Sequence, residues 1–320
     1  GPGKVFFSNS GAEANEGLYK VARKFGHAEG RFEIITAHNS FHGRTLAGIS
    51  ATGQEKVKKG FEPLVPGFRH VPYNDLEAVR QAISPATVAV LIEPIQGESG
   101  VTPARADYLL GLRQLCDERH LLLLLDEVQG GYFRTGRFAS YQRLLEEVPG
   151  GQNFLPDGIS WAKSIAGGFP LGAFWVRAPY ADLLSPGTHA STYGGSPLGC
   201  AVGLKVLEVI RRDRLEDHAR QLGDYLKDQL QSIANRYPRV LKEVRGFGLM
   251  IGLELADGIP ALSRSEKTHA VQFVNALHYK GVLTVPAGTH VARLLPALNL
   301  KRSEADEGLQ LIEQVVASLA

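Results

Sequence analysis

Two acids and one lysine are the first residues of this sequence whose positions need a chemical explanation. Asp126 and Glu127 follow a run of five leucines, which predicts a buried strand, and the flexible pair Gly130-Gly131 then lets the chain turn away. Lys163 lies among small and apolar residues in SWAKSIAGGF. A buried charge is costly unless an opposite charge pairs with it, and a desolvated lysine can attack a carbonyl carbon. Either these groups reach solvent at strand ends, or an acid meets a buried cation.

The stretch SNSGAEAN, residues 8–15, is a third chemical signal. Its small residues stand between an expected strand and an expected helix, so free backbone N–H groups and the helix dipole can hold a phosphate. An ordinary turn capped by Ser10 would look the same in isolation. Together, an anion-binding turn, a strand-end acid and a buried lysine are the parts of a pyridoxal 5′-phosphate site. The lysine forms the Schiff base, the acid pairs with the pyridinium nitrogen, and the turn holds the phosphate.

The elements that must position these groups alternate between strands and helices. Strands are expected at 4–7, 32–38, 87–95 and 121–128, and helices at 12–26, 75–83 and 106–120. Such alternation predicts an α/β fold with a mostly parallel sheet covered on both faces. Ligands of these sheets bind at the carboxyl ends of the strands, where VFFSNSG, LIEP and LLLLDE all end.

The pattern changes after about residue 210. The expected elements there are a long amphipathic helix, a hairpin, a second helix, a strand and a C-terminal helix, at 211–237, 240–257, 266–281, 291–298 and 303–319. We therefore expect residues 1–210 to form a large cofactor-binding domain and residues 211–320 a smaller C-terminal α+β domain.

Composition and charge narrow the class of protein. Hydrophobic residues make up 44% and charged residues 21%, as in soluble globular proteins. The net charge of +2 gives no reason to expect a nucleic-acid or membrane partner. Two cysteines, Cys116 and Cys200, are too few for a disulfide scaffold and favour a cytoplasmic location, with a targeting segment upstream of Gly1 as the alternative. No metal site is expected.

A series of motifs resembles the class III (fold type I) aminotransferases, most closely the acetylornithine/ornithine aminotransferase group. In the family's order they are NSGAEANE (9–16), FHGRT (41–45), EPIQGESG (93–100), LLLDEVQ (123–129), RTG (134–136), AKSIAGGFPLGA (162–173), STYGGSP (191–197) and VRGFGLMIGLEL (244–255). The series covers nearly the whole chain and is far more specific than any single motif. The resemblance implies a mostly parallel, seven-stranded-type sheet in the large domain, with the family's N-terminal segment absent from this sequence.

The resemblance also implies a role for each matched residue around the cofactor. Lys163 resembles the Schiff-base lysine, which afterwards moves the proton, and Asp126 resembles the partner of the pyridine nitrogen. Gln129 is expected to reach the 3-oxygen of the ring, and Phe41 to stack on the ring. Glu127 has no implied contact.

The phosphate site and the quaternary structure are implied in the same way. Gly11 and Ala12 resemble backbone ligands of the phosphate. Thr192 resembles a phosphate ligand that comes from the neighbouring subunit, so the resemblance implies a homodimer with shared active sites.

Four further matches imply how substrates are chosen. Arg44 resembles the arginine that binds the α-carboxylate of an ornithine-type substrate, with Ser191 as the neighbouring contact. Arg293 matches the arginine for the α-carboxylate of glutamate or 2-oxoglutarate, and Glu98 the glutamate that masks it while an ω-amine is bound.

The implied reaction is transfer of an ω-amino group to 2-oxoglutarate, with N-acetylornithine the favoured donor. Ornithine, succinylornithine or 4-aminobutyrate are alternative donors, and FHGRT with the Glu98/Arg293 pair speaks against an aminomutase. A nicotinamide dehydrogenase would need a G-x-G-x-x-G turn after its first strand, which we do not find. A shortened, poorly active chain that keeps the cofactor-binding fold is the remaining alternative.

Overall fold

The computed structural model describes residues 1–263 and 265–320, and these form two compact units. The first unit consists of Gly1–Pro94, Ala104–Tyr132 and Ala139–Val209, and the second of Ile95–Pro103, Phe133–Phe138 and Ile210–Ala320. A single division at residue 210 is therefore incomplete, because two short segments join the second unit. Hydrogen bonds hold them there: Arg245 donates to the Gly100 carbonyl at 2.9 Å, and Arg134 donates to the Leu249 carbonyl at 3.3 Å.

A seven-stranded sheet in the order β1-β9-β8-β7-β4-β2-β3 forms the centre of the first unit. Its strands are β1 (Gly3–Ser8), β2 (Glu33–Ala37), β3 (Phe68–Val71), β4 (Thr87–Ile92), β7 (Leu122–Asp126), β8 (Gly158–Trp161) and β9 (Gly172–Arg177). Neighbouring strands from β8 to β3 are parallel, whereas β9 is antiparallel to both β1 and β8. The mostly parallel sheet predicted from the sequence is confirmed.

The helices of this unit include all three that the sequence predicted. They are α1 (Gly11–Gly26), α2 (Leu46–Ala51), α3 (Glu55–Lys58), α4 (Leu76–Ala82), α5 (Ala106–Arg119), α6 (Ser140–Leu144) and most of α7 (Pro197–Arg212). Asp75 caps α4 as expected, because its side chain accepts a hydrogen bond from the Ala78 amide at 2.9 Å. The short helices α2, α3 and α6 and the longer α7 had no predicted counterpart.

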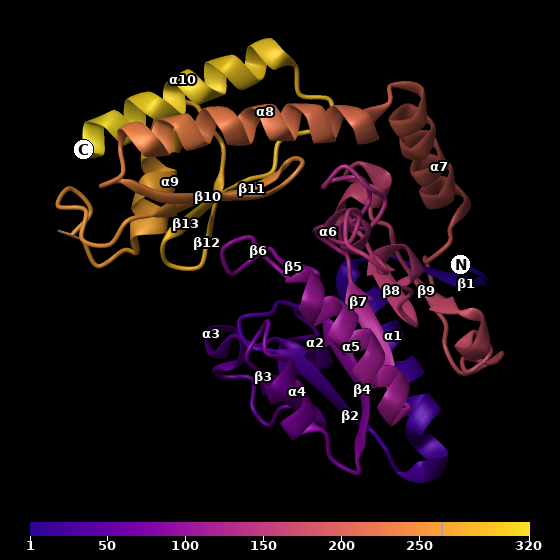
Figure 1. The fold of residues 1–320 in the computed structure, drawn as a ribbon. Helices are drawn as coiled ribbons and strands as arrows, with labels where there is room; N and C mark the ends of the chain where they lie inside the picture. Colours follow the sequence, from indigo (N-terminus) through magenta and orange to yellow (C-terminus); the bar gives the residue numbers. More distant parts are fainter. Residues whose placement is uncertain (264) are drawn as a thin grey trace. The chain divides into compact units, whose positions relative to one another are not determined.

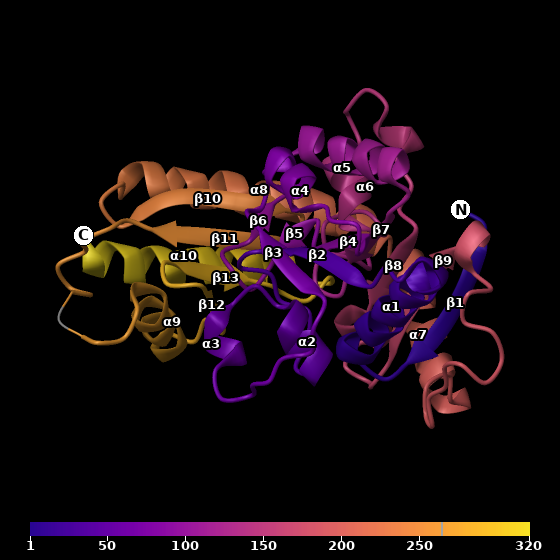
Figure 2. The ribbon, with the colours of Figure 1, turned by 90° about the horizontal axis from the view of Figure 1, so that it is seen from below.

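Both faces of the large sheet are covered, as a parallel sheet requires. Successive side chains of a strand point to opposite faces. In β7, Leu124 belongs to a core cluster with Leu18 of α1, whereas α5 also contacts this strand. Figure 2 shows α1 and α5 on opposite sides of the sheet. The leucine run is apolar throughout because neither of its faces meets water.

The second unit is built on a four-stranded antiparallel sheet in the order β10-β11-β13-β12. Its elements are β5 (Ile95–Gln96), β6 (Thr102–Pro103), α8 (Leu215–Arg236), β10 (Leu241–Phe247), β11 (Met250–Leu255), α9 (His269–Tyr279), β12 (Val285–Ala287), β13 (Val291–Leu294) and α10 (Arg302–Leu319). One core cluster joins Leu226 of α8, Phe273 of α9 and Ile312 of α10 to the sheet. Figure 1 shows α8 and α10 side by side. The predicted hairpin at 240–257 is confirmed as β10 and β11.

The helix predicted at 211–237 is wrong at its start. Arg214 has a left-handed backbone with φ of 51°, so α7 ends at Arg212 and α8 begins at Leu215. Glu216 and Asp217 lie in the first turn of α8, where acidic side chains complement the helix dipole. No helix in the described parts of the chain is both long and apolar enough to cross a membrane.

Candidate active site

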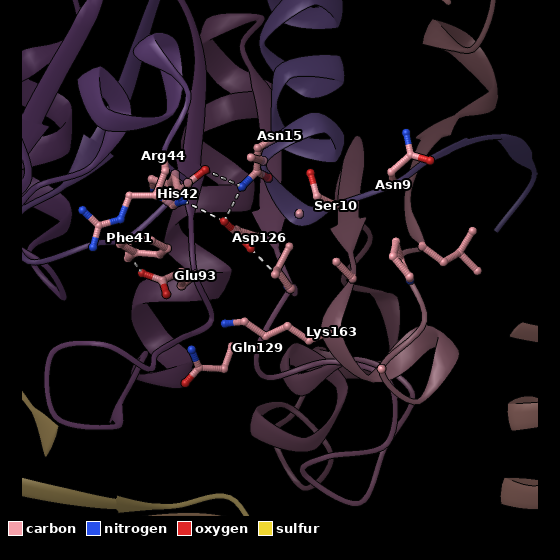
Figure 3. A pocket seen from close by; sticks show the side chains of 18 of the residues that line it. Asn9, Ser10, Asn15, Phe41, His42, Arg44, Glu93, Asp126, Gln129 and Lys163 are labelled. Atoms are coloured by element: carbon pink, nitrogen blue, oxygen red, sulfur yellow. Dashed lines mark hydrogen bonds and ion pairs between the residues drawn. The ribbon is translucent and has the colours of Figure 1, made fainter. Parts of the chain in front are cut away.

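A cavity of about 520 Å³ opens in the first unit, and its walls include the residue that ends β7. Seven residues singled out in the sequence line it: Gly11, Ala12, Phe41, Arg44, Asp126, Gln129 and Lys163. Figure 3 shows these groups reaching it from separate elements, with Lys163 and Gln129 extending into the same space. The sheet therefore brings together residues that are far apart in the sequence.

The start of α1 forms one wall of the cavity. Ser10 has an extended backbone and caps the helix, because its hydroxyl accepts a hydrogen bond from the Glu13 amide at 3.2 Å. Gly11 follows at a point of close approach, where an added Cβ would lie 2.7 Å from Cγ1 of Val128. A residue without a side chain is required there, and it brings the first helical turn against the chain that leaves β7.

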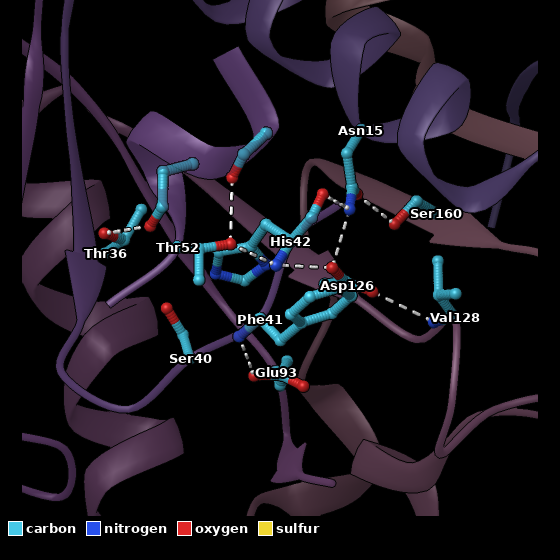
Figure 4. Close-up of polar contacts among 12 residues, drawn as sticks. Asn15, Thr36, Ser40, Phe41, His42, Thr52, Glu93, Asp126, Val128 and Ser160 are labelled. Atoms are coloured by element: carbon cyan, nitrogen blue, oxygen red, sulfur yellow. Dashed lines mark hydrogen bonds and ion pairs between the residues drawn. The ribbon is translucent and has the colours of Figure 1, made fainter. Parts of the chain in front are cut away.

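Asp126 is buried, with 5% of its surface exposed, and its carboxylate accepts three hydrogen bonds. Asn15 donates to Oδ2 at 2.7 Å, and the Val128 amide donates to Oδ1 at 3.0 Å. The Nδ1 atom of His42 lies 2.8 Å from Oδ2. Figure 4 shows the carboxylate at the centre of this network. The predicted burial of Asp126 is confirmed, and donors surround the charge.

The two side-chain partners of Asp126 are held in place themselves. Asn15 also donates to the His42 carbonyl at 3.0 Å and accepts from Ser160 at 2.6 Å. His42 is buried, and in the described part of the chain its Nε2 atom has no hydrogen-bond partner. The imidazole is therefore oriented by Asp126 alone. Neither residue is recognisable from the sequence alone as a site residue, although Asn15 lies in NSGAEANE and His42 in FHGRT.

Lys163 stands two residues after β8, at the start of a short 3-10 turn (Lys163–Ala166). Its backbone is left-handed with φ of 48°, which is unusual for a residue with a side chain. Such strain is commonly found at functional sites, where the surrounding structure holds it in place. In Figure 3 the side chain extends towards the side of the cavity where Glu93 and Phe41 lie.

Phe41, Arg44 and Glu93 form the wall opposite Lys163 in Figure 3. The Phe41 amide donates to Oε2 of Glu93 at 3.0 Å. The Arg44 guanidinium lies over the Phe41 ring, 5.4 Å from its centroid. Among the described residues Arg44 makes no ion pair, so its guanidinium has no anionic protein partner. Glu93 was not singled out from the sequence, although it lies in LIEP and directly follows β4.

Glu127, left without a role by the sequence, ties β7 to α6. It is buried and does not line the cavity. Its carboxylate accepts hydrogen bonds from Ser140 Oγ at 2.6 Å and from the Tyr141 amide at 3.0 Å. Burial raises the pKa of Glu127 to about 7, against these hydrogen bonds. The two acids at the end of the leucine run therefore have separate surroundings.

The two glycines after Gln129 lie in a turn, as expected, but neither has a left-handed backbone. The left-handed backbone that turns the chain occurs at Tyr132 and Phe133, with φ of 55° and 68°, and not at the glycines. Gly131 instead allows close packing, because an added Cβ would lie 2.7 Å from the Glu127 carbonyl oxygen. The Gly131 amide also donates to the Glu127 carbonyl at 3.0 Å, so the glycines lie in the turn itself and allow its close packing.

Ser191 and Thr192 do not line the cavity of Lys163. They line a second cavity of about 340 Å³ in the same unit, together with Tyr193. Asn9 lines both cavities, and its side chain donates to Ser191 Oγ at 3.2 Å. Thr192 thus lies in a neighbouring cavity of its own chain.

Glu98 and Arg293 belong to the second unit, where they form an ion pair. Nη1 of Arg293 lies 3.0 Å from Oε1 of Glu98 and donates to the Gly97 carbonyl at 2.7 Å. Arg293 is buried, and the Glu98 side chain is about one third exposed. The structure brings the two predicted residues together as a partly exposed pair.

The sequence model of the aminotransferase class-III family matches residues 1–316. The chain belongs to this family. It is 45% identical over 319 residues to the acetylornithine aminotransferase of Gloeobacter violaceus, a match that covers 99% of this chain and 75% of that protein. It is 43% identical, with the same coverage, to a succinylornithine transaminase/acetylornithine aminotransferase of Pseudomonas aeruginosa. The ornithine aminotransferase structure from Toxoplasma gondii matches with a TM-score of 0.88 at 32% identity, over 99% of this chain and 73% of that one.

Class III aminotransferases use pyridoxal 5′-phosphate, and the cavity of this family member has the donor set that the cofactor needs. A helix N-terminus faces the cavity for the phosphate, and a buried carboxylate is available for the protonated ring nitrogen. A lysine amine and an aromatic ring complete the set. The family predicted from the motifs is confirmed, and the cofactor fits the residues present.

Proposed function

We propose that this chain transfers the ω-amino group of N-acetylornithine to 2-oxoglutarate, yielding a semialdehyde and glutamate. The cavity that brings Lys163, Asp126 and the start of α1 together is the observation that carries the proposal. The identity of 45% to an acetylornithine aminotransferase supports the choice of donor. Both lines of support point to one reaction class and one group of donors.

Each of these cavity residues would hold a different part of the cofactor. Pyridoxal phosphate, when bound, supplies a carbonyl carbon for amine exchange and a ring that accepts electrons. Lys163 would hold it covalently, and the carboxylate of Asp126 would pair with its ring nitrogen. The N–H groups of Gly11 and Ala12 would bind the phosphate. Phe41 would stack on the ring, and Gln129 would reach its 3-oxygen.

Lys163 would also move the proton during the reaction. Its side chain extends into the cavity that Asp126 also lines, where the cofactor would bind. The carboxylate of Asp126 would lie next to the cofactor, with three hydrogen-bond donors around it. Neither role requires a group from outside the cavity.

Arg44 is the proposed ligand for the α-carboxylate of the amino donor, and Ser191, which lines the second cavity, is the proposed neighbouring contact. Its guanidinium lines the cavity without an anionic partner among the described residues, and a planar guanidinium suits a carboxylate. Arg293 is the proposed ligand for the α-carboxylate of 2-oxoglutarate. Its contact with Glu98 at 3.0 Å supports a masked state in which a substrate carboxylate competes with Glu98.

The test is a set of half-reactions on the purified, cofactor-loaded protein. N-acetylornithine, succinylornithine, ornithine and 4-aminobutyrate are each mixed with it, and loss of the visible absorbance of the lysine-bound cofactor is followed. We expect the fastest change with N-acetylornithine. Lys163→Ala should abolish both absorbance and turnover, whereas Lys56→Ala, at an exposed position of α3, should change neither. Retained turnover in Lys163→Ala would refute the assignment.

Succinylornithine is the second candidate donor. The relative from Pseudomonas aeruginosa carries both activities in its name and is 43% identical to this chain. The two donors differ only in the acyl group on the α-nitrogen, so a cavity that accepts one has the ligands for the other. A faster half-reaction with succinylornithine would reverse their order.

A homodimer with shared active sites is part of the same proposal. Thr192 lines a cavity separate from that of Lys163, which is the placement expected of a residue that serves a partner chain. Tyr193, next to it, is 74% exposed in the single chain. Light scattering would give the assembly. Mixing Lys163→Ala with Thr192→Ala should restore activity only if each site takes these residues from different chains. We further propose a cytoplasmic location, which the two unpaired cysteines support.

A further inference from the structure

Glu93 is a buried acid in the cavity that the proposed function does not use. It follows β4, and β4 pairs in parallel with β7, so Glu93 and Asp126 stand at the same edge of the sheet. Both line the cavity that Lys163 lines. Only 5% of Glu93 is exposed. An acid in this position needs either a permanent partner or a task that involves a proton.

The two carboxylate oxygens of Glu93 differ in their hydrogen bonding to the protein. Oε2 accepts the hydrogen bond from the Phe41 amide at 3.0 Å, as Figure 4 shows. Oε1 has no hydrogen-bond partner within residues 1–263 and 265–320. Asp126, by contrast, accepts three hydrogen bonds. A donor bound in the cavity would supply a partner for Oε1, because Glu93 lines that cavity.

The charged and titratable groups around Glu93 act in opposite directions. Burial, and after it the negative charge of Asp126, raise the pKa of Glu93 to a net value of about 7. His42, the Phe41 amide and Lys163 oppose that rise. A carboxyl that titrates near neutral pH suits proton exchange, because both of its forms are then available.

The Tyr73 hydroxyl and the Arg44 guanidinium complete the surroundings of Glu93. Tyr73 donates to the backbone carbonyl of Glu93 at 2.7 Å and leaves the carboxyl alone. Arg44 lies over the Phe41 ring on the same wall. If Arg44 takes the α-carboxylate of the donor, the opposite charge of that donor, its ω-ammonium, needs an anion inside the cavity.

We propose that Glu93 receives the ammonium end of the amino donor and takes one of its protons. This step rests on the proposed function. An N–H bond of the ammonium breaks, its electron pair stays on nitrogen, and an O–H bond forms at Oε1. The products are a neutral amine, which is nucleophilic, and a neutral carboxyl, which later releases the proton to solvent. Total charge is conserved and no other reactant is required.

The first experiment compares Glu93→Gln with Glu127→Gln. Glutamine keeps an acceptor for the Phe41 amide but cannot take a proton. The two acids are matched, because both are buried and burial raises each pKa to about 7, but only Glu93 lines the cavity. At pH 7 we expect Glu93→Gln to slow the half-reaction with N-acetylornithine by roughly 10²-fold, a typical size for acid–base catalysis. Glu127→Gln should stay within about threefold of the unmodified protein.

An amine of lower pKa separates proton transfer from a structural effect. A fluorinated analogue of the donor has a more acidic ammonium, so a larger fraction of it arrives deprotonated. With this analogue, Glu93→Gln should slow the half-reaction by less than about tenfold. The plot of its half-reaction rate against pH should also lack the limb near neutral pH. Glu93→Asp, which stays ionisable, should keep that limb. An equal loss with both amines, or an unchanged pH profile in Glu93→Gln, would overturn the proposal.

Infrared spectroscopy of the cofactor-free protein gives a readout that does not depend on turnover. The difference between the unmodified protein and Glu93→Gln should show one carboxyl band that disappears as the pH passes through 7. If this carboxyl band does not titrate, the inference about Glu93 is overturned and the proposed function is not affected. Absence of any half-reaction in the unmodified, loaded protein overturns the proposed function instead, so the two failures are distinguishable.

Discussion

Replacing Glu127 by glutamine should change how stability depends on pH. Burial raises the pKa of this carboxyl from 4.5 to about 7, so the folded protein binds the proton more tightly than the unfolded chain does. A group of this kind contributes its stability below pH 4.5 and loses it as the pH rises through 7. Glutamine does not titrate, so the variant lacks this loss.

The magnitude follows from the size of the shift. A change from 4.5 to about 7 corresponds to about 3 kcal/mol, at 1.36 kcal/mol for each pH unit. The free energy of unfolding of the unmodified protein, minus that of Glu127→Gln, should therefore fall by about 3 kcal/mol between pH 4 and pH 8. At low pH the two proteins should be closest in stability, because a protonated Glu127 and a glutamine are both neutral and each offers one carbonyl oxygen and one donor group to Ser140 and Tyr141.

The assay is urea unfolding of the cofactor-free protein at several pH values, followed by tryptophan fluorescence. The sequence has two tryptophans, Trp161 and Trp175, and both belong to the unit that contains Glu127. The signal therefore reports the unit in which the change is made. A stability difference that stays constant within about 1 kcal/mol over this pH range would show that Glu127 is not destabilised by burial, and would refute the reasoning.

Three further changes test other parts of the structure. Asp157→Ala should destabilise the first unit by about 3–5 kcal/mol in the same assay, because the buried carboxylate pairs with Arg113 at 2.8 Å; a loss below 1 kcal/mol contradicts this. Leu124→Ala, at a fully buried position of β7, should cost about 2–5 kcal/mol, while the exposed Leu46→Ala should stay within about 0.5 kcal/mol. Glu98→Ala removes the carboxylate 3.0 Å from its arginine and should lower KM for 2-oxoglutarate about fivefold; a higher KM would argue against the masking role.

The main parts of the site could be predicted because each stands out from its neighbours in the sequence. For the acid and the lysine, the signal is a charged side chain in surroundings that predict burial. Asp126 stands out as a charge at the end of an apolar run, and Lys163 as an amine among small residues. The turn before α1 stands out by its small residues and their place between a strand and a helix. The order of the motifs then identifies the family, which no single residue does.

The partners of these residues could not be predicted, because only the fold brings them near. Asn15 is 111 positions from Asp126 in the sequence, and His42 is 84 positions away. Glu93 meets the Phe41 amide across 52 positions. Each lies inside a recognisable motif, but the motif names a residue without naming the atom that it contacts. The sheet order β7-β4-β2, which no local pattern encodes, decides these contacts.

Backbone details escaped prediction for a related reason. The sequence assigns the turn after Gln129 to the glycines, since glycine tolerates a left-handed backbone. The left-handed residues are instead Tyr132 and Phe133, both buried aromatics. Packing of large side chains can outweigh the local preference of the backbone. The break between α7 and α8 at Arg214 also escaped prediction, because no neighbouring residue in the sequence rules out a continuous helix.

The hydrogen-bond partners of three buried acids show how one edge of a sheet can give the same chemical group different tasks. Asp126 accepts three hydrogen bonds inside the cavity, so its charge is stabilised where a cation would bind. Glu127, the next residue, is tied to α6 outside the cavity. Glu93 accepts a single hydrogen bond from the protein, which leaves its other carboxyl oxygen for a ligand in the cavity. Glu127 accepts more hydrogen bonds than Glu93 although burial raises both pKa values to about 7, so Glu93 is distinguished by its place in the cavity and not by its number of donors.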